Sequence, residues 1–145
     1  QAIEAVDGVG SFGVEFFLLA DGTILVNEIA PRPHNSGHYT IEACECSQFE
    51  NHIRAIRGLP LGSTKLRAPA AMVNLLGKTT ATGAPRGIAD ALATSGAHLH
   101  LYGKLHAARG RKMGHVTALG SSADEALATA QRAADCIHFD QPLLT

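Results

Sequence analysis

Hydrophobic residues near the start of the chain form two short runs that a tight turn separates. Residues 13–19 (GVEFFLL) and 23–29 (TILVNEI) are rich in β-branched and aromatic side chains, which is typical of strands. Asp21-Gly22 between them is a strong hairpin signal. Residues 30–39 then contain two prolines, and proline cannot donate a hydrogen bond to a sheet. The pattern predicts an antiparallel hairpin followed by a loop.

A helix is predicted after the loop, because a capping sequence comes directly before apolar residues at helical spacing. The capping sequence is Ser47-Gln-Phe-Glu50, whose side chains can satisfy the first amides of a helix. The apolar residues are Phe49, Ile53 and Ile56. Gly58 follows the last of them and marks the end of the helix. Residues 58–68 (GLPLGSTKLRA) predict a connector between two domains.

The second half of the chain again mixes strand and helix patterns. A second capping sequence, Ser122-Ala-Asp-Glu125, begins an alanine-rich helix. The predicted strands are 70–76, 98–102 and 112–119, and the predicted helices are 88–94 and 122 to about 136. This order predicts an α+β fold in two domains, residues 1–62 and 68–145, the first with a mostly antiparallel sheet and the second small.

Composition and charge exclude several classes of protein. Of the 145 residues, 46% are hydrophobic and 17% are charged, so a core can form and disorder is not expected. Twelve Lys and Arg against 13 Asp and Glu give a net charge of −1, without the basic surplus of a nucleic-acid binder. No apolar run approaches the roughly 20 residues that span a bilayer. We therefore expect neither nucleic acid nor a membrane as a partner.

The start of the chain and its cysteines suggest where the protein works. The first residue is Gln1 rather than methionine, and residues 1–6 have the pattern of the end of a helix, so we expect a fragment of a longer protein. No secretory signal is evident. Cys44, Cys46 and Cys136 are an odd number of cysteines, which argues against a disulfide framework and for reduced thiols in the cytoplasm.

Two glutamates of the hairpin are predicted to oppose each other. With Asp21-Gly22 as a two-residue loop, Glu15 lies opposite Glu28, with Cβ atoms about 4.5–5.5 Å apart. Phe17 and Val26 are their expected neighbours on that face, so poor solvation would increase the repulsion. A proton on one carboxyl or a cation between the two would relieve it. Alternatively, the strands end early and water solvates both groups.

Magnesium suits such a site, because carboxylates and the amide oxygen of Asn27 are hard oxygen ligands and Mg²⁺ leaves room for phosphate oxygens. The loop that follows strengthens this interpretation. Arg32 carries a guanidinium that matches the oxygens of a phosphate or carboxylate, and two prolines flank it. His34 is suited to proton transfer near neutral pH. Asn35 and His38 add further polar groups within the same loop.

A second group of cations lies between two predicted strands of the second domain. Lys104 and Arg111 stand at the two ends of a turn that contains Gly110. Two cations in this arrangement can converge on one phosphate. A solvated basic turn, to which Arg109 and Lys112 also belong, is the alternative.

Several of these motifs resemble one known family. GVEFF around Glu15 and VNEIAPRPHNSGHYTIEAC around Glu28 resemble the metal-binding end of the ATP-grasp superfamily. More closely, they are similar to the N5-carboxyaminoimidazole ribonucleotide synthase family. The similarity continues through residues 47–50, 58–62, 72–77, 102–104 and 110–115, and so covers nearly the whole chain.

The resemblance implies a function and a set of site residues. Members of this family use ATP and bicarbonate to carboxylate 5-aminoimidazole ribonucleotide in purine biosynthesis, by way of carboxyphosphate. Carried over by position, the Mg²⁺ ligands are Glu15 and Glu28, the groups at the ATP phosphates are Asn27 and Glu28, the catalytic residues are Arg32, His34 and Lys104, and the substrate-binding residues are Asn35, Lys104 and Arg111. The fold implied is the C-terminal part of an ATP-grasp domain followed by a small α+β domain.

The resemblance also implies partners and leaves two alternatives. It implies a homodimer, a missing N-terminal half without which this fragment is inactive, and a fused or separate mutase. A formate-dependent glycinamide ribonucleotide transformylase shares the PRPH sequence but differs from Asn35-Ser36-Gly37-His38. A non-catalytic assembly module that keeps the ATP-grasp fold is the other alternative.

Overall fold

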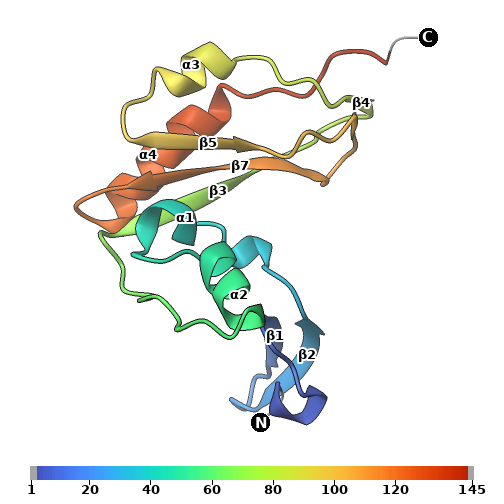
Figure 1. Ribbon diagram of the computed structural model, residues 1–145. Helices are drawn as coiled ribbons and strands as arrows, with labels where there is room; N and C mark the ends of the chain where they lie inside the picture. The colour runs from blue at the N-terminus through green and yellow to red at the C-terminus, as the bar shows by residue number, and fades with distance from the viewer. Residues whose placement is uncertain (1–2, 144–145) are drawn as a thin grey trace. The chain divides into compact units, whose positions relative to one another are not determined.

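The elements of the chain fall into two groups in the structure, a computed structural model that describes residues 3–143. Unit 1 is Gln1–Arg67 and unit 2 is Ala68–Thr145 (Figure 1). Unit 1 contains η1 (Glu4–Val6), β1 (Gly13–Leu18), β2 (Ile24–Ala30), η2 (Asn35–Gly37), α1 (Thr40–Ala43) and α2 (Gln48–Ile56). Unit 2 contains β3 (Ala70–Leu76), β4 (Ala81–Thr82), α3 (Ile88–Leu92), β5 (Ala97–Leu101), β6 (His106–Ala107), β7 (Lys112–Leu119) and α4 (Ala123–Asp135). All strand pairs given for these elements are antiparallel, which agrees with the predicted α+β class.

The hairpin of β1 and β2 has a longer turn than predicted. Leu19 donates its amide to the carbonyl of Thr23, and Gly22 donates to the carbonyl of Leu19, so three residues form the loop. Gly22 has a φ of 84°, a left-handed conformation that completes a three-residue hairpin loop. Phe16 pairs with Val26, one residue away from the predicted register. The prediction of a two-residue loop is therefore wrong.

A β-bulge then restores the predicted pairing at the other end of the hairpin. The register shifts between Glu15 and Phe16, which leaves Asn27 as the extra residue on β2. Beyond the bulge, Glu15 pairs with Glu28. The predicted opposition of the two glutamates is thus confirmed, although the loop and the strand both differ from the regular hairpin assumed for it.

Helix α2 begins and ends as its sequence predicts. The Ser47 hydroxyl accepts a hydrogen bond from the amide of Glu50 at 3.2 Å. At the other end, Gly58 donates to the carbonyl of Ala55 and Leu59 donates to that of Arg54, the two bonds of a Schellman motif. The Glu50 carboxylate pairs with Arg54 one turn later, and this pairing lowers the pKa of Glu50.

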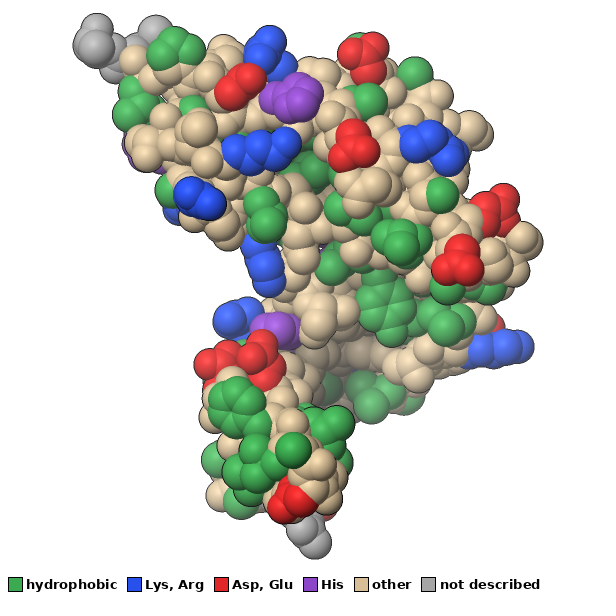
Figure 2. Space-filling view, turned by 180° about the vertical axis from the view of Figure 1, so that it is seen from behind, with side chains coloured by type: hydrophobic (Ala, Val, Ile, Leu, Met, Phe, Trp, Pro, Cys, Tyr) green, Lys and Arg blue, Asp and Glu red, His purple; other side chains and the backbone are tan. Residues whose placement is uncertain are grey.

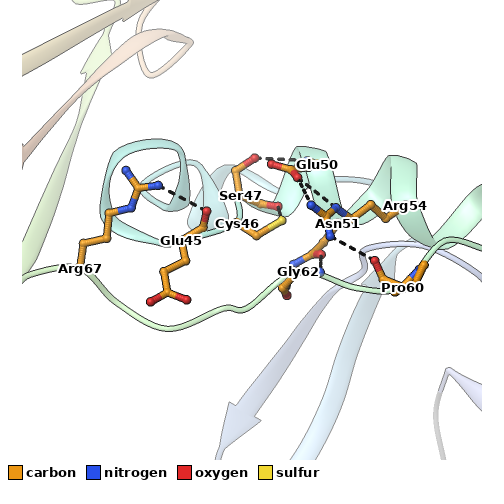
Figure 3. Close-up of polar contacts among 9 residues, drawn as sticks. All are labelled: Glu45, Cys46, Ser47, Glu50, Asn51, Arg54, Pro60, Gly62 and Arg67. Atoms are coloured by element: carbon orange, nitrogen blue, oxygen red, sulfur yellow. Dashed lines mark hydrogen bonds and ion pairs between the residues drawn. The ribbon is translucent and has the colours of Figure 1, made fainter.

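Residues 58–67 of the predicted connector belong to unit 1 and are hydrogen-bonded to the rest of it. The Asn51 side chain accepts from the amide of Gly62 at 2.8 Å and donates to its carbonyl at 3.3 Å. Arg54 donates to the carbonyl of Pro60, and Arg67 donates to that of Glu45 (Figure 3). The connector therefore has a defined path rather than the freedom of a linker.

Unit 2 is built on a three-stranded sheet with α4 packed against it. The strand order is β3-β7-β5, and β7 is buried in the centre. Ser122 caps α4 by accepting from the amide of Glu125 at 3.2 Å. The core joins the inner face of this helix to the sheet (Figure 1). Its members include Leu75, Met113, Val116, Ala130, Ala133, Ile137 and Phe139.

The predicted bounds of the longer strands and helices in unit 2 agree closely with those observed. Strands β3 and β7 match the predicted ranges, while β5 begins one residue earlier and α3 ends two residues earlier than expected. The two-residue strands β4 and β6 were not predicted, nor was α1 in unit 1. Within residues 3–143, the structure contains no helix with the length and hydropathy needed to cross a membrane.

Candidate functional site

Two opposed carboxylates lie at the bulged end of the hairpin. Glu15 and Glu28 are paired across β1 and β2, and both are exposed. The prediction that apolar neighbours shield the two glutamates from solvent is wrong. The Glu15 side chain is 47% exposed, and Val26 pairs with Phe16 rather than at the predicted register. The carboxylates therefore face solvent, where a ligand can reach them. In Figure 2, hydrophobic side chains gather over the hairpin, whose exposed apolar residues include Phe16, Phe17, Leu18 and Val26.

His34 lies beside this pair. Its Nε2 is 3.4 Å from a carboxylate oxygen of Glu15, and its side chain is only 18% exposed. On the other side of the ring, Nδ1 lies 2.8 Å from the Ser36 hydroxyl and accepts from the amide of Ser36. With Nδ1 as the acceptor, the neutral ring carries its proton on Nε2, toward Glu15. His34 is thus the loop residue that the structure joins to the carboxylates.

Arg32 and Asn35 occupy the same loop in different environments. Arg32 is exposed, and its guanidinium donates to the carbonyl of Pro33 at 3.2 Å. Asn35 begins the 3₁₀ turn η2 and is half-buried. Asn27 is the exposed bulge residue next to Glu28. The structure therefore gathers the predicted residues of unit 1 on the hairpin and the loop that follows it, with the Arg32 side chain directed to the carbonyl of the next residue, Pro33.

One residue of this region was missed by the sequence analysis. Gln48, the first residue of α2, accepts from the amide of His34 at 3.0 Å and donates to the carbonyl of His34 at 2.8 Å. The same side-chain nitrogen lies 2.8 Å from Nδ1 of His38. The capping sequence predicted a helix start at this position, but nothing in it indicates that the amide would reach back 14 residues to the loop.

The predicted phosphate-binding cations belong to unit 2. Lys104 lies three residues beyond the end of β5, and Arg111 directly precedes β7, so neither stands inside a strand. The Lys104 ammonium donates to the carbonyl of Lys112 at 2.5 Å and lies 5.6 Å from the centre of the Tyr102 ring. Arg111 donates to the carbonyl of His106 at 2.9 Å. Each cation is therefore oriented by a carbonyl at the start of a strand, Lys104 by that of Lys112 in β7 and Arg111 by one in β6.

An aromatic cluster supports this loop from inside unit 2. The Tyr102 hydroxyl lies 2.8 Å from Nδ1 of His115, which is 2% exposed. The ring of His115 stacks on that of His100, with centroids 4.4 Å apart and planes 13° from parallel. The cluster links the central strand β7 to Tyr102 and, through the Tyr102 ring, to Lys104.

The three cysteines are free thiols. Burial raises the pKa of Cys44, and burial with the nearby carboxylate of Glu50 raises that of Cys46. A raised pKa keeps a thiol protonated and unreactive. Cys44 and Cys46 are therefore buried, protonated thiols, which agrees with the predicted absence of a disulfide framework among the described cysteines.

Comparisons with known proteins identify the class to which the fold and the carboxylate pair belong. A model of the ATP-grasp domain matches residues 1–49. A model of the phosphoribosylaminoimidazole carboxylase C-terminal domain matches residues 70–129. The chain thus joins an ATP-grasp segment to the C-terminal domain of a carboxylase.

Three relatives narrow the class to one family. The Bacillus subtilis N5-carboxyaminoimidazole ribonucleotide synthase is 53% identical over 117 residues, which are 81% of this chain and 30% of the relative. A crystal structure of the Thermotoga maritima synthetase matches 97% of this chain with a TM-score of 0.83 and 55% identity, over 39% of its own length. The Aspergillus clavatus synthase, in complex with ADP and 5-aminoimidazole ribonucleotide, matches 92% of this chain with a TM-score of 0.77 and 45% identity, over 36% of its length.

This chain belongs to the N5-carboxyaminoimidazole ribonucleotide synthase family, and the resemblance inferred from its sequence is confirmed. It spans about a third of the length of the relatives it matches.

Proposed function

We propose that this chain forms part of an ATP-grasp ligase that carboxylates 5-aminoimidazole ribonucleotide to N5-carboxyaminoimidazole ribonucleotide, with ATP and bicarbonate, in purine biosynthesis. The observation that carries the proposal is the exposed Glu15–Glu28 pair with His34 at 3.4 Å from Glu15. Its relatives support the choice of substrates, because the Aspergillus clavatus synthase binds both ADP and 5-aminoimidazole ribonucleotide.

The donor set at the carboxylate pair fits Mg²⁺ held together with a nucleotide. Glu15 and Glu28 supply hard carboxylate oxygens, and Asn27 supplies an amide oxygen next to them. Within residues 3–143, no group of three or more His, Cys, Asp or Glu side chains is arranged to hold a metal. The remaining ligands would therefore be phosphate oxygens and water, as is usual for Mg²⁺. When bound, the ion neutralises the charge of the phosphates during transfer.

Three residues of the loop that follows β2, Arg32, His34 and Asn35, have roles in the proposed reaction. Bicarbonate attacks the γ-phosphoryl group of ATP, which forms carboxyphosphate and releases ADP. The guanidinium of Arg32 stabilises the anionic oxygens of bicarbonate and carboxyphosphate. The His34 ring, already oriented toward Glu15, orients or transfers a proton beside them. In this proposal the side-chain amide of Asn35, at the start of η2 in the same loop, contacts the substrate.

Lys104 and Arg111 bind the phosphate of the ribonucleotide in this proposal. The Lys104 ammonium donates to a carbonyl at the start of β7, and the Arg111 guanidinium donates to one in β6. The strands next to them therefore orient both cations, which can bind phosphate oxygens. The amine of the aminoimidazole then forms a bond to the carboxyl carbon of carboxyphosphate, or of the CO₂ that carboxyphosphate releases, while inorganic phosphate leaves and the amine loses a proton. Exclusion of water protects the unstable carboxyphosphate. In this proposal Lys104 both binds the phosphate of the ribonucleotide and acts as a catalytic residue near the reacting groups.

The proposal extends to the setting of the enzyme. The chain acts with the remaining part of an ATP-grasp enzyme, as a homodimer in the cytoplasm, and it does not turn over by itself. A mutase, fused or separate, uses the product. The exposed apolar hairpin supports the need for a covering partner, because large apolar patches on a surface mark interaction sites.

A chimera tests the function. This chain replaces the matching segment of the Bacillus subtilis synthase, and ADP release is measured with ATP, Mg²⁺, bicarbonate and 5-aminoimidazole ribonucleotide. We expect release that depends on the ribonucleotide and falls by roughly a hundredfold or more in Glu28→Gln, which removes one metal ligand. Glu45→Gln is the matched control, because Glu45 is an exposed glutamate of the same unit.

Three outcomes would contradict the proposal or a part of it. Release that requires glycinamide ribonucleotide and formate instead would assign the chain to the transformylase. A folded chimera that binds ATP but releases no ADP under either condition would leave an assembly module. Equal activity of Glu28→Gln and Glu45→Gln would remove the metal role from the carboxylate pair.

A further inference from the structure

The side chain of Gln48 makes three hydrogen bonds to the loop that carries His34. Its oxygen accepts from the His34 amide at 3.0 Å, and its nitrogen donates to the His34 carbonyl at 2.8 Å. The second hydrogen of the same nitrogen is directed to Nδ1 of His38 at 2.8 Å. One side chain on α2 thus holds the residues at both ends of the His34–His38 loop.

The backbone partners fix which way the Gln48 amide points. A main-chain N–H can only donate and a main-chain carbonyl can only accept, so the oxygen must face the His34 amide and the nitrogen the His34 carbonyl. The nitrogen is therefore the group that meets His38, and it can only donate. Nδ1 of His38 must then be the acceptor, which leaves the proton of the neutral ring on Nε2.

Gln48 is itself held from several directions. The main-chain amide of Gln48 donates to the Thr40 hydroxyl at 2.9 Å, and that hydroxyl donates to the carbonyl of Gly37 at 2.6 Å. The main-chain carbonyl of Gln48 accepts from the Ser11 hydroxyl at 3.0 Å. A Cβ at Gly37 would come within 2.5 Å of the Gln48 side-chain oxygen, so the loop approaches this amide as closely as glycine permits.

The same helix contains a second amide with the same chemistry and a different target. Asn51, one turn beyond Gln48, accepts from the amide and donates to the carbonyl of Gly62 in the connector. Each of the two side chains makes two hydrogen bonds to the backbone of one residue. The partner of Gln48 is His34, beside Glu15, whereas the partner of Asn51 is Gly62 in the connector. Asn51 is therefore a natural control for a role that is merely structural.

We propose that Gln48 is a positioning residue, which holds the His34 ring against Glu15 and keeps His38 as the neutral Nε2–H tautomer. The part that concerns catalysis rests on the proposed function, whereas the tautomer of His38 does not. Loss of the Gln48 amide frees the His34 backbone, and an ångström of misplacement at a reacting group can cost two orders of magnitude in rate.

Nuclear magnetic resonance of the ¹⁵N-histidine-labelled chain tests the tautomer directly. We expect the Nε2–H form of His38 in the wild-type chain. In Gln48→Glu the carboxylate has the same shape but cannot donate, so we expect His38 to gain a proton on Nδ1. Asn51→Asp, the matched change, should leave the His38 signals unchanged. An Nδ1–H tautomer in the wild-type chain would overturn the proposal without any variant.

The Bacillus subtilis chimera tests the positioning role. We expect Gln48→Met to lower kcat for ADP release by roughly tenfold to a hundredfold, and Asn51→Leu by less than about twofold at a similar shift in Tm. Equal losses of kcat in the two variants would reduce Gln48 to a structural residue. An inactive wild-type chimera would contradict the proposed function, and the histidine spectra would still decide the inference.

Discussion

The two units of the chain are stabilised in different ways. Unit 2 has a continuous core, in which residues such as Met113 and Val116 are at most 1% exposed. The buried hydrophobic residues of unit 1 are small, namely Ala30, Ala43, Cys44 and Cys46. Its large apolar side chains, such as Phe16, Leu18 and Ile24, are more than half exposed.

Side-chain hydrogen bonds to the backbone give unit 1 much of its order. Gln48 and Asn51 each bind one backbone residue at two points, and Ser47 caps the helix that carries them. Such bonds fix the positions of loops, but each contributes only about 1 kcal/mol to stability. Unit 1, which contains the carboxylate pair, therefore has a precise local geometry although it buries few apolar side chains.

Separation of the two units is the most severe test of this difference. We expect residues 68–145 to unfold cooperatively in urea when expressed alone, because their core is internal. Residues 1–67 alone should show no cooperative transition and should bind a dye that reports exposed apolar surface. A sharp urea transition in residues 1–67 would contradict the comparison.

Truncation of one large apolar side chain in each unit gives the next largest effect. Met113→Ala empties space in the core of unit 2 and should lower its free energy of unfolding by about 2–5 kcal/mol. Phe17→Ala removes a ring that is 54% exposed, and should change the stability of the chain by less than about 1 kcal/mol. Urea denaturation measures both values, and similar losses would show that unit 1 has a core of its own.

The two helix caps should contribute equally, because both units use the same device. Ser47→Ala and Ser122→Ala each remove the acceptor for a backbone amide, at a cost of about 1 kcal/mol. Hydrogen exchange should become faster at the amides of Glu50 and Glu125, while the Ser→Asp variants retain protection. Faster exchange at only one of the two amides would show that the caps differ.

Acid sensitivity is the smallest effect expected. In unit 2, the hydrogen bonds from Arg86 lower the pKa of Asp140. The folded state therefore binds this proton less readily than the unfolded state, so the stabilisation is present above the ordinary carboxyl pKa and is lost as pH falls through the lowered value. We expect Asp140→Asn to have a lower Tm than the wild type at about pH 7, with a difference that shrinks below about pH 4.

The same reasoning applies to unit 1, where Arg54 lowers the pKa of Glu50. Glu50→Gln should show the same direction of pH dependence, and both differences should decrease in high salt because the pairs are exposed. A Tm difference that grows as the pH falls would contradict the assignment.

Local patterns in the sequence predicted most of the fold. The capping sequences at Ser47 and Ser122 placed two helices, and the apolar runs placed β3 and β7 within their observed bounds. These signals act within a few residues, so a single sequence contains them. The short strands β4 and β6 depend on partners more than 20 residues away, and their sequences give no signal of their own.

Signals that act within a few residues also predicted part of the candidate site. The opposition of Glu15 and Glu28 follows from one hairpin, and the loop at Arg32 and His34 is unusually rich in functional groups. Gln48 could not be predicted, because its partners in the loop are 10 and 14 residues away. The three-residue turn was missed, since Asp21-Gly22 favours a two-residue turn equally well.

The bulge at Asn27 affects how related sequences should be compared. If Asn27 were deleted, Glu28 would still pair with Glu15 and Val26 with Phe16, because the extra residue has no partner on β1. A one-residue gap at this position in a homologous sequence is therefore compatible with an intact carboxylate pair. What such a homologue would lose is the local twist of the strand and the Asn27 amide, so insertions and deletions here report on the shape of the site rather than on its presence.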